Sequence, residues 1–320
     1  MTDRIIVFNA MADNETTYAQ VNKTAKSPTK KSSEASLVNE GGMKKNFRRI
    51  DLIATVQQLV KSSKYNRALE LINELLTQQT EGWDRLHTLL MKIECEIQSG
   101  RRGIKNDIEL VTESMLILRP TTSDVMDIAQ DYATSKNEMR SIALYMAGIE
   151  LCKINLSGDA AVRGIKSCIK HITGIVNSAA KADPSILIVI KESIIPLLLD
   201  GVKTMDQIHG VSPNAITEQK ARCMFNAGIC YRVVGDDELA LKSHENAVQL
   251  MQLEFKDEAV HYQVYGRSIA GMGHSHRNLK KVEKAKELYQ TALIALNHAT
   301  DWTSEEQKDK ETSILEKLLN

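Results

Sequence analysis

Apolar residues recur at the three- and four-residue spacing of an amphipathic α-helix from Phe47 almost to the C-terminus. Short polar breaks interrupt the pattern, so the sequence predicts antiparallel helix pairs joined by brief turns. The predicted pairs are 47–62 with 65–78, 81–98 with 104–118, 122–135 with 138–154, 159–181 with 184–200, 213–234 with 237–254, and 257–279 with 281–299. A last helix is predicted at 303–319. We therefore expect an all-α domain over 45–320, with about six helix pairs and a C-terminal capping helix.

Prolines mark several of the predicted boundaries. Pro120 ends a helix, and Ser212-Pro213 places a capping side chain before a proline at the first helical position. Pro196 lies inside a predicted helix, where it removes a backbone donor and crowds the preceding turn. We expect it to kink that helix or to end it early.

Two segments of the chain align with each other at an offset of 45 residues, which indicates an internal repeat. Small residues at matching places in two packed helices let the backbones approach, while bulky residues fill the spaces between them. The matching residues are Gly228 with Gly273, Ala240 with Ala285, Ala247 with Ala292, Arg222 with Arg267, and Arg232 with Arg277.

The run Gly228, Tyr231, Gly235-Asp236, Ala240 and Ala247 resembles the signature of the tetratricopeptide (TPR) repeat family. The last unit keeps Gly273, Ala285, Tyr289 and Ala292, and the first unit fits at Tyr65, Ala68 and Leu75. The resemblance implies a right-handed solenoid of helical hairpins that binds other proteins, or peptide segments of them, in a concave groove. The residues alone leave a non-repeating helical bundle as the alternative.

By this resemblance, one set of side chains is expected to line the groove. Guanidinium groups pair well with carboxylates, so the four arginines of this set favour an acidic or C-terminal peptide as the ligand. The alternative is that these arginines are solvated on helix surfaces. Phe225 and Ile229 stand where the family's clamp for chaperone C-termini needs Asn and Lys, so that ligand is not expected. The expected groove residues are Arg222, Phe225, Ile229, Arg232, Arg267, His274, Arg277 and Asn278.

Composition and motifs argue against catalysis. Basic and acidic residues balance at 41 each, so the chain lacks the excess positive charge that drives binding to nucleic acid. It has no phosphate-binding loop, HExxH or GxSxG motif, and its five cysteines are spread singly through apolar patterns as expected of buried thiols. His261, His274 and His276 lack a further ligand, and we expect no metal, no cofactor and no enzymatic activity.

Residues 22–42 are rich in Lys, Ser, Thr and Gly and show no helical or strand periodicity, so we expect a disordered tail over 1–44. Lys30-Lys31 and the cluster from Lys44 to Arg49 resemble a bipartite nuclear-import signal. The chain has no apolar run long enough to span a bilayer, and no secretory signal. We expect a cytoplasmic protein without membrane insertion, with nuclear import as an alternative.

These observations favour a protein-protein interaction scaffold or adaptor. One alternative is a nuclear or nucleic-acid-associated regulatory factor that uses the basic tail and dimerises through its repeats. Another is the sensor arm of a larger signalling or defence complex whose catalytic module is carried on a different chain.

Overall fold

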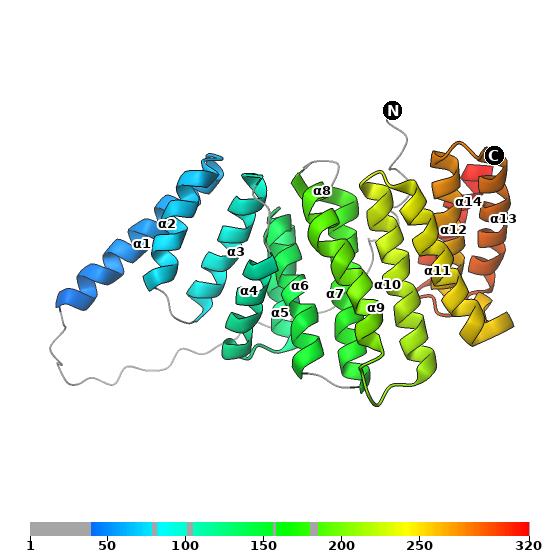
Figure 1. Cartoon of the computed structure of the whole chain (residues 1–320), viewed down its shortest axis with the longest axis horizontal. Coiled ribbons are helices and arrows are strands. Elements are labelled where there is room, and N and C mark those ends of the chain that lie inside the picture. Colours follow the sequence, from blue (N-terminus) through cyan, green and yellow to red (C-terminus); the bar gives the residue numbers. More distant parts are fainter. Residues whose placement is uncertain (1–39, 79–81, 101–104, 156–157, 180–184, 320) are drawn as a thin grey trace.

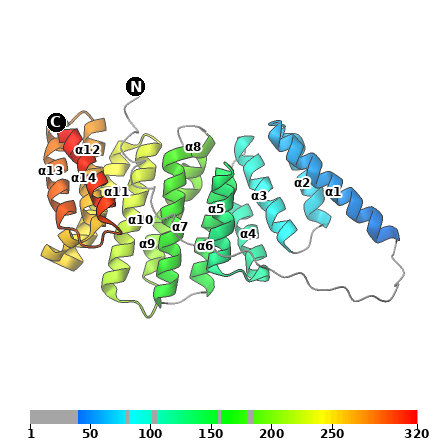
Figure 2. The ribbon, with the colours of Figure 1, turned by 180° about the vertical axis from the view of Figure 1, so that it is seen from behind.

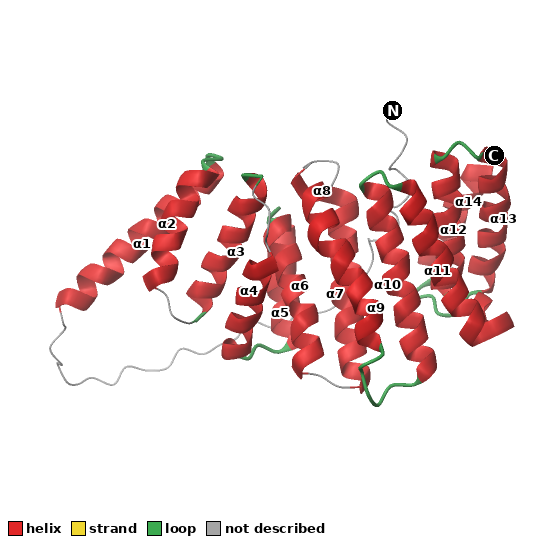
Figure 3. Ribbon diagram, viewed as in Figure 1, coloured by secondary structure: helices red, strands yellow, loops and turns green. Residues whose placement is uncertain are grey.

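The protein is a row of α-helices, described in a computed structural model over residues 40–78, 82–100, 105–155, 158–179 and 185–319 (Figure 1). Every regular element among these residues is helical, with loops between them (Figure 3), which confirms the predicted all-α class. The α-helices are α1 (Glu40–Lys61), α2 (Tyr65–Gln78), α3 (Trp83–Gln98), α4 (Lys105–Leu118), α5 (Thr122–Thr134), α6 (Glu138–Asn155), α7 (Gly158–Ala179), α8 (Ser185–Val189), α9 (Ile195–Met205), α10 (Pro213–Val233), α11 (Asp237–Phe255), α12 (Gln263–Asn278), α13 (Val282–His298) and α14 (Glu305–Leu319). A π-helical turn, η1 (Ile190–Ile194), and a 3₁₀-helix, η2 (Lys256–His261), complete the set.

The helices stand side by side in chain order, from α1 at one end to α13 and α14 at the other, and the view from behind shows the same order (Figure 2). Successive helices form the main contacts: α10 with α11, α11 with α12, α12 with α13, and α13 with α14. Helix α10 also contacts α7 and α12, whereas no comparable contact joins α11 to α13 in the described part of the chain. Among the same residues, no helix combines the length and the apolar character that a bilayer crossing requires.

The apolar core is distributed along the row rather than gathered at one centre. Helix α3 illustrates how the sequence dictates this, because Leu86, Leu89, Leu90 and Ile93 recur at helical spacing and are all buried. Burying one such side chain contributes about 1.5–3 kcal/mol to folding before conformational entropy is subtracted. The largest cluster joins α3 through α10, and separate clusters lie around α1–α2, α10–α11 and α12–α14.

The repeat residues lie where small side chains are required. Gly228 of α10 faces His244 of α11, and a Cβ atom on Gly228 would lie 2.5 Å from the Cε1 of that histidine. At the same offset of 45 residues, a Cβ on Gly273 would lie 2.6 Å from the Cε1 of Tyr289. Tyr231 packs partly buried at the edge of the large core cluster. The remaining small residues are all buried: Ala240, Ala247, Ala285 and Ala292.

Pro196 is accommodated by a π-helical turn rather than by an early end. The helix predicted at 184–200 forms as α8, η1 and α9, and the Ile195 N–H donates to the carbonyl of Ile190, five residues back. Such a turn inserts one extra residue just before the proline, at the place where the proline ring would crowd the preceding carbonyls. The helical direction therefore continues to Met205, five residues beyond the predicted end.

The helix predicted at 257–279 is divided in two by a contact from a distant part of the chain. The 3₁₀-helix η2 ends at His261, and α12 begins at Gln263, whose backbone N–H donates to Oδ1 of Asp301 at 2.7 Å. Thr300 holds the other side of the break, because its N–H donates to the carbonyl of His261 at 2.9 Å. Asp301 thus supplies the cap that the local sequence lacks.

The helical part begins earlier than predicted. Helix α1 starts at Glu40, so residues 40–44 belong to a helix and not to the tail. Gly41-Gly42 weakens the local helix propensity, which is why the sequence predicts a later start. The rest of the predicted tail, with Lys30-Lys31, lies outside the described residues.

Candidate functional site

Two of the predicted groove arginines are paired with carboxylates of the same chain. Arg222 of α10 donates through Nε to Glu218 at 2.7 Å and through Nη2 to Asp301 at 3.1 Å. Arg267 of α12 forms a two-bond pair with Glu311 of α14, with its Nε 2.8 Å from Oε2. These acidic groups neutralise the two arginines from within, so neither presents an unmatched positive charge to a partner.

The Arg267–Glu311 pair is structural. The Glu311 side chain is fully buried, and the Arg267 guanidinium carbon lies 5.4 Å from the centre of the Trp302 ring. A buried carboxylate is stable only when a cation and hydrogen bonds replace its water, which Arg267 supplies here. The pair thereby holds α14 against α12.

The four arginines do not form one continuous ladder. Arg232 follows Arg222 by ten residues, which on an α-helix means about 15 Å along the axis and about 80° around it. Arg232 is partly buried, and burial lowers its pKa to about 10, while nearby Asp237 raises it. Arg277 lies exposed at the C-terminal end of α12, and its charge lowers the pKa of Tyr289, which burial raises to about 12.

The apolar members of the predicted groove face the interior instead. Phe225 and Ile229 are buried in a cluster with Met251 of α11, so their place in a solvent-facing groove is corrected. His274 is also buried, with its Nδ1 3.0 Å from the Tyr289 hydroxyl. The resemblance placed them on the groove side, but their positions on α10 and α12 turn them toward the neighbouring helices.

Asn278, the last predicted groove residue, is partly buried and donates from Nδ2 to Oδ1 of Asp237 at 2.8 Å. This bond joins the C-terminal end of α12 to the N-terminal end of α11. Asn278 therefore connects two hairpins rather than offering its amide to a partner.

His244 is enclosed between α10 and α12 without a polar partner. A Cβ on Gly228 or on Gly271 would lie only 2.5 Å or 2.6 Å from its ring, so both glycines are needed to admit it. Neither ring nitrogen has a hydrogen-bond partner among the described residues. Burial, and then the charge of Arg232, lower the pKa of His244 to about 3. The ring is therefore neutral at physiological pH.

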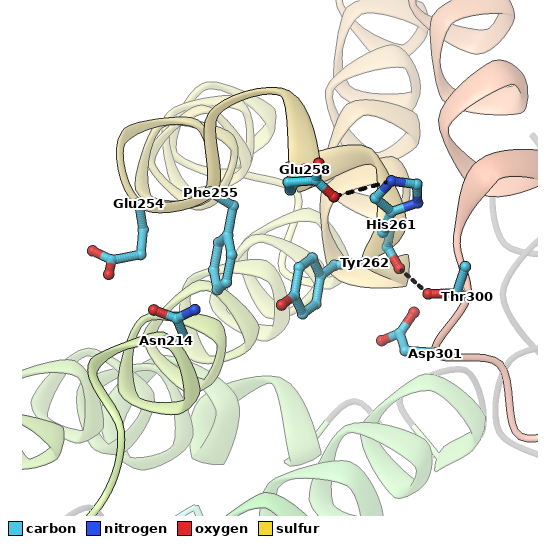
Figure 4. A pocket seen from close by; sticks show the side chains of 8 residues that line it. All are labelled: Asn214, Glu254, Phe255, Glu258, His261, Tyr262, Thr300 and Asp301. Atoms are coloured by element: carbon cyan, nitrogen blue, oxygen red, sulfur yellow. Dashed lines mark hydrogen bonds and ion pairs between the residues drawn. The ribbon is translucent and has the colours of Figure 1, made fainter.

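A cleft of about 630 Å³ opens beside Arg222, at the end of α11. It collects residues from the start of α10, the end of α11, η2 and the segment after α13 (Figure 4). We call it the η2 cleft. Its lining residues are Asn214, Glu254, Phe255, Glu258, His261, Tyr262, Thr300 and Asp301.

Aromatic rings and carboxylates dominate the η2 cleft. The Phe255 and Tyr262 rings lie 4.4 Å apart between centroids, inclined at 44°. Burial raises the pKa of Tyr262, and the neighbouring carboxylates Glu218, Asp301 and Glu258 raise it further. The phenol therefore stays protonated in a region of negative potential.

Several contacts hold the cleft walls in place. Lys256 follows α11 directly, and its φ of 49° starts the reversal into η2. His261 lies 3.2 Å from Glu258 and 3.2 Å from the carbonyl of His298, so it joins η2 to the end of α13. The cleft is thus built on fixed elements rather than on a free loop.

The cysteine thiols are not poised for nucleophilic chemistry. All five are buried, and burial raises the pKa of Cys95, Cys168, Cys223 and Cys230 to about 12 and that of Cys152 to about 11. The reactive thiolate is correspondingly scarce at neutral pH. Among the described residues, no group of three His, Cys, Asp or Glu side chains comes together as a metal site.

The carboxylates that organise this region were not predicted from the sequence. Glu218 lies one turn before Arg222, a spacing that marks an ion pair on a predicted helix. Asp301 and Glu311 lie 79 and 44 residues from their arginines, and no local pattern connects such positions. Comparisons with known proteins add no family: no protein-family model matches the chain, and no curated protein matches it either.

Proposed function

We propose that this chain is a non-enzymatic scaffold of the tetratricopeptide type, which holds a partner polypeptide against the face formed by α7, α10 and α12, here called the inner face. The contact pattern carries the proposal: α10 contacts α7 and α12, whereas α11 and α13 lack a comparable contact in the described residues. In a curved helical stack, helices on the concave side approach one another and those on the convex side spread apart. The pattern supports a solenoid whose first helices line a groove.

Charged groups from three elements meet on the inner face around Lys166 of α7. Partial desolvation of the ammonium group, and then the charge of Arg222, lower the pKa of Lys166, while Glu218 and Asp301 act in the opposite direction. Arg222 is itself bonded to Glu218 at 2.7 Å and to Asp301 at 3.1 Å, so these groups form one charged cluster. A polypeptide with charged side chains suits such a surface.

A row of exposed basic residues lies on α7. Arg163, Lys166 and Lys170 are spaced by three and four residues and are all exposed, so they lie along one face of α7. Arg222 and Arg267 are paired with carboxylates of the same chain. We therefore assign the binding of an acidic partner segment to the basic row on α7 instead of to these arginines. An acidic stretch of the partner would lie along α7.

The proposal is tested by charge reversal on α7. Lys166→Glu combined with Lys170→Glu should remove partners that the tagged wild-type protein captures from a native lysate, because attraction becomes repulsion. The control is Lys286→Glu on α13, an exposed lysine away from α7. Both proteins should keep the wild-type melting temperature, because exposed charges contribute little to stability. An unchanged set of captured partners in the α7 variant would contradict the inner-face proposal.

A further inference from the structure

We propose that the η2 cleft binds a lysine or arginine side chain of an extended segment in a partner polypeptide. This inference rests on the scaffold function and names one feature of the partner. In this proposal the partner carries an acidic stretch that lies over α7. On the other side of Arg222 it carries a basic residue that enters the η2 cleft.

The charge of the lining favours a cation. Three of the eight lining residues are carboxylates, Glu254, Glu258 and Asp301, and none is a lysine or arginine. Glu254 and Glu258 are exposed at the cleft surface, and Glu258 is held in position by His261. Asp301 is already bound by Arg222 and by the backbone of Gln263. The glutamates are therefore left to attract a cation, with Glu258 near Tyr262 and Glu254 at the outer edge of the cleft beyond Phe255 (Figure 4).

The aromatic pair supplies the second requirement of a long basic side chain. Lysine and arginine bury an aliphatic stem while the charged head stays near water or a carboxylate. Tyr262 and Phe255, with rings 4.4 Å apart, give an apolar wall for the stem, and a guanidinium plane stacks favourably on an aromatic ring. In Figure 4 the two rings lie between Asn214 on one side and Glu258 with Asp301 on the other.

The size and position of the cleft favour a peptide over a free amino acid. A volume of about 630 Å³ exceeds that of one side chain, so backbone flanking the anchor fits as well. Asp301 lines the η2 cleft and is bonded to Arg222 of α10 at 3.1 Å, so the cleft adjoins the inner face beside Arg222. An extended segment that crosses the inner face therefore reaches the cleft.

The test uses two fluorescein-labelled peptides of seven residues, with alanine and glycine around a central arginine or around citrulline, its neutral isostere. Fluorescence anisotropy with the full chain should show the arginine peptide binding at least tenfold more tightly than the citrulline peptide. Glu254→Gln combined with Glu258→Gln should remove this difference, whereas Glu283→Gln, an exposed carboxylate on α13, should retain it.

Several results would overturn the inference. They are no binding of the arginine peptide at millimolar concentration, equal binding of the two peptides, or an undiminished preference in the double glutamine variant. Concentration-dependent dimerisation in sedimentation that the same variant abolishes would mean that a second copy occupies the cleft. If the α7 charge-reversal variant loses partner capture but the cleft variant does not, the scaffold proposal is retained and the cleft proposal is rejected. If the α7 charge-reversal variant still captures the partners and the protein still prefers the arginine peptide, the inner-face proposal is rejected and the cleft is retained.

Discussion

The enclosed histidine of α11 makes the stability of this protein sensitive to acid. His244 has a pKa of about 3 in the folded chain, against 6.5 when it is unperturbed. A depressed folded pKa means that the unfolded chain binds the proton more tightly. The contribution of His244 is therefore fully present above pH 6.5 and is lost progressively as the pH falls toward 3.

The magnitude follows from the two pKa values. At pH 5 the unfolded histidine is mostly protonated and the folded one is not, so the free energy of unfolding falls by about 2 kcal/mol relative to pH 8. His244→Phe places an uncharged ring between Gly228 and Gly271 and removes this loss. The ring makes no hydrogen bond in the described structure, so the substitution sacrifices none.

Urea unfolding at pH 8 and pH 5, followed by circular dichroism, measures the effect. The wild-type protein should lose about 2 kcal/mol more between the two pH values than His244→Phe does. Ser243→Ala, at the adjacent buried position, alters packing without removing a titratable group and should keep the wild-type loss. If wild type and His244→Phe lose the same free energy, the histidine is solvated or protonated in the folded chain and the reasoning fails.

Other substitutions test the packing and the buried polar groups. Gly228→Ala should lower stability by about 1–3 kcal/mol because its Cβ would lie 2.5 Å from His244, whereas Gly201→Ala, 3.5 Å from a cysteine sulfur, should raise it by up to about 1 kcal/mol. Urea melts showing the same sign for both would refute the contact geometry. Arg267→Ala should cost about 3–5 kcal/mol by stranding buried Glu311, while Arg67→Ala, which removes an exposed pair, should cost under about 1 kcal/mol in the same assay. The five buried thiols should react with a thiol reagent at neutral pH only as fast as the chain opens, and rapid labelling of the native protein would contradict their raised pKa values.

Much of the secondary structure could be read from the sequence, because helices are encoded by residues within one or two turns of each other. Helix α2 begins and ends at the predicted residues, 65 and 78. Ser212 caps α10 as predicted, accepting a hydrogen bond from the N–H of Ala215 at 3.3 Å. The buried glycine and alanine positions of the last two hairpins were found in the same way, since the repeat is itself a pattern along the chain.

The candidate site was predicted less well, because a helical period says which residues share a face but not what that face meets. Phe225 and Ile229 were expected in a groove, and packing against α11 buried them. Arg222 and Arg267 were expected to bind carboxylates of a partner, but they pair with Asp301 and Glu311 of the same chain.

The sequence by itself determined that this chain folds into helical hairpins with small residues at their closest contacts, because apolar period, capping and glycine placement act locally. Tertiary structure alone decided that Asp301 caps α12, that Glu311 neutralises Arg267, and that Gly271 closes over His244. These partners come from different helices or from the segments between them, often dozens of residues apart. Folding brings them together because buried charges and rings must find complementary groups, wherever in the chain those groups lie.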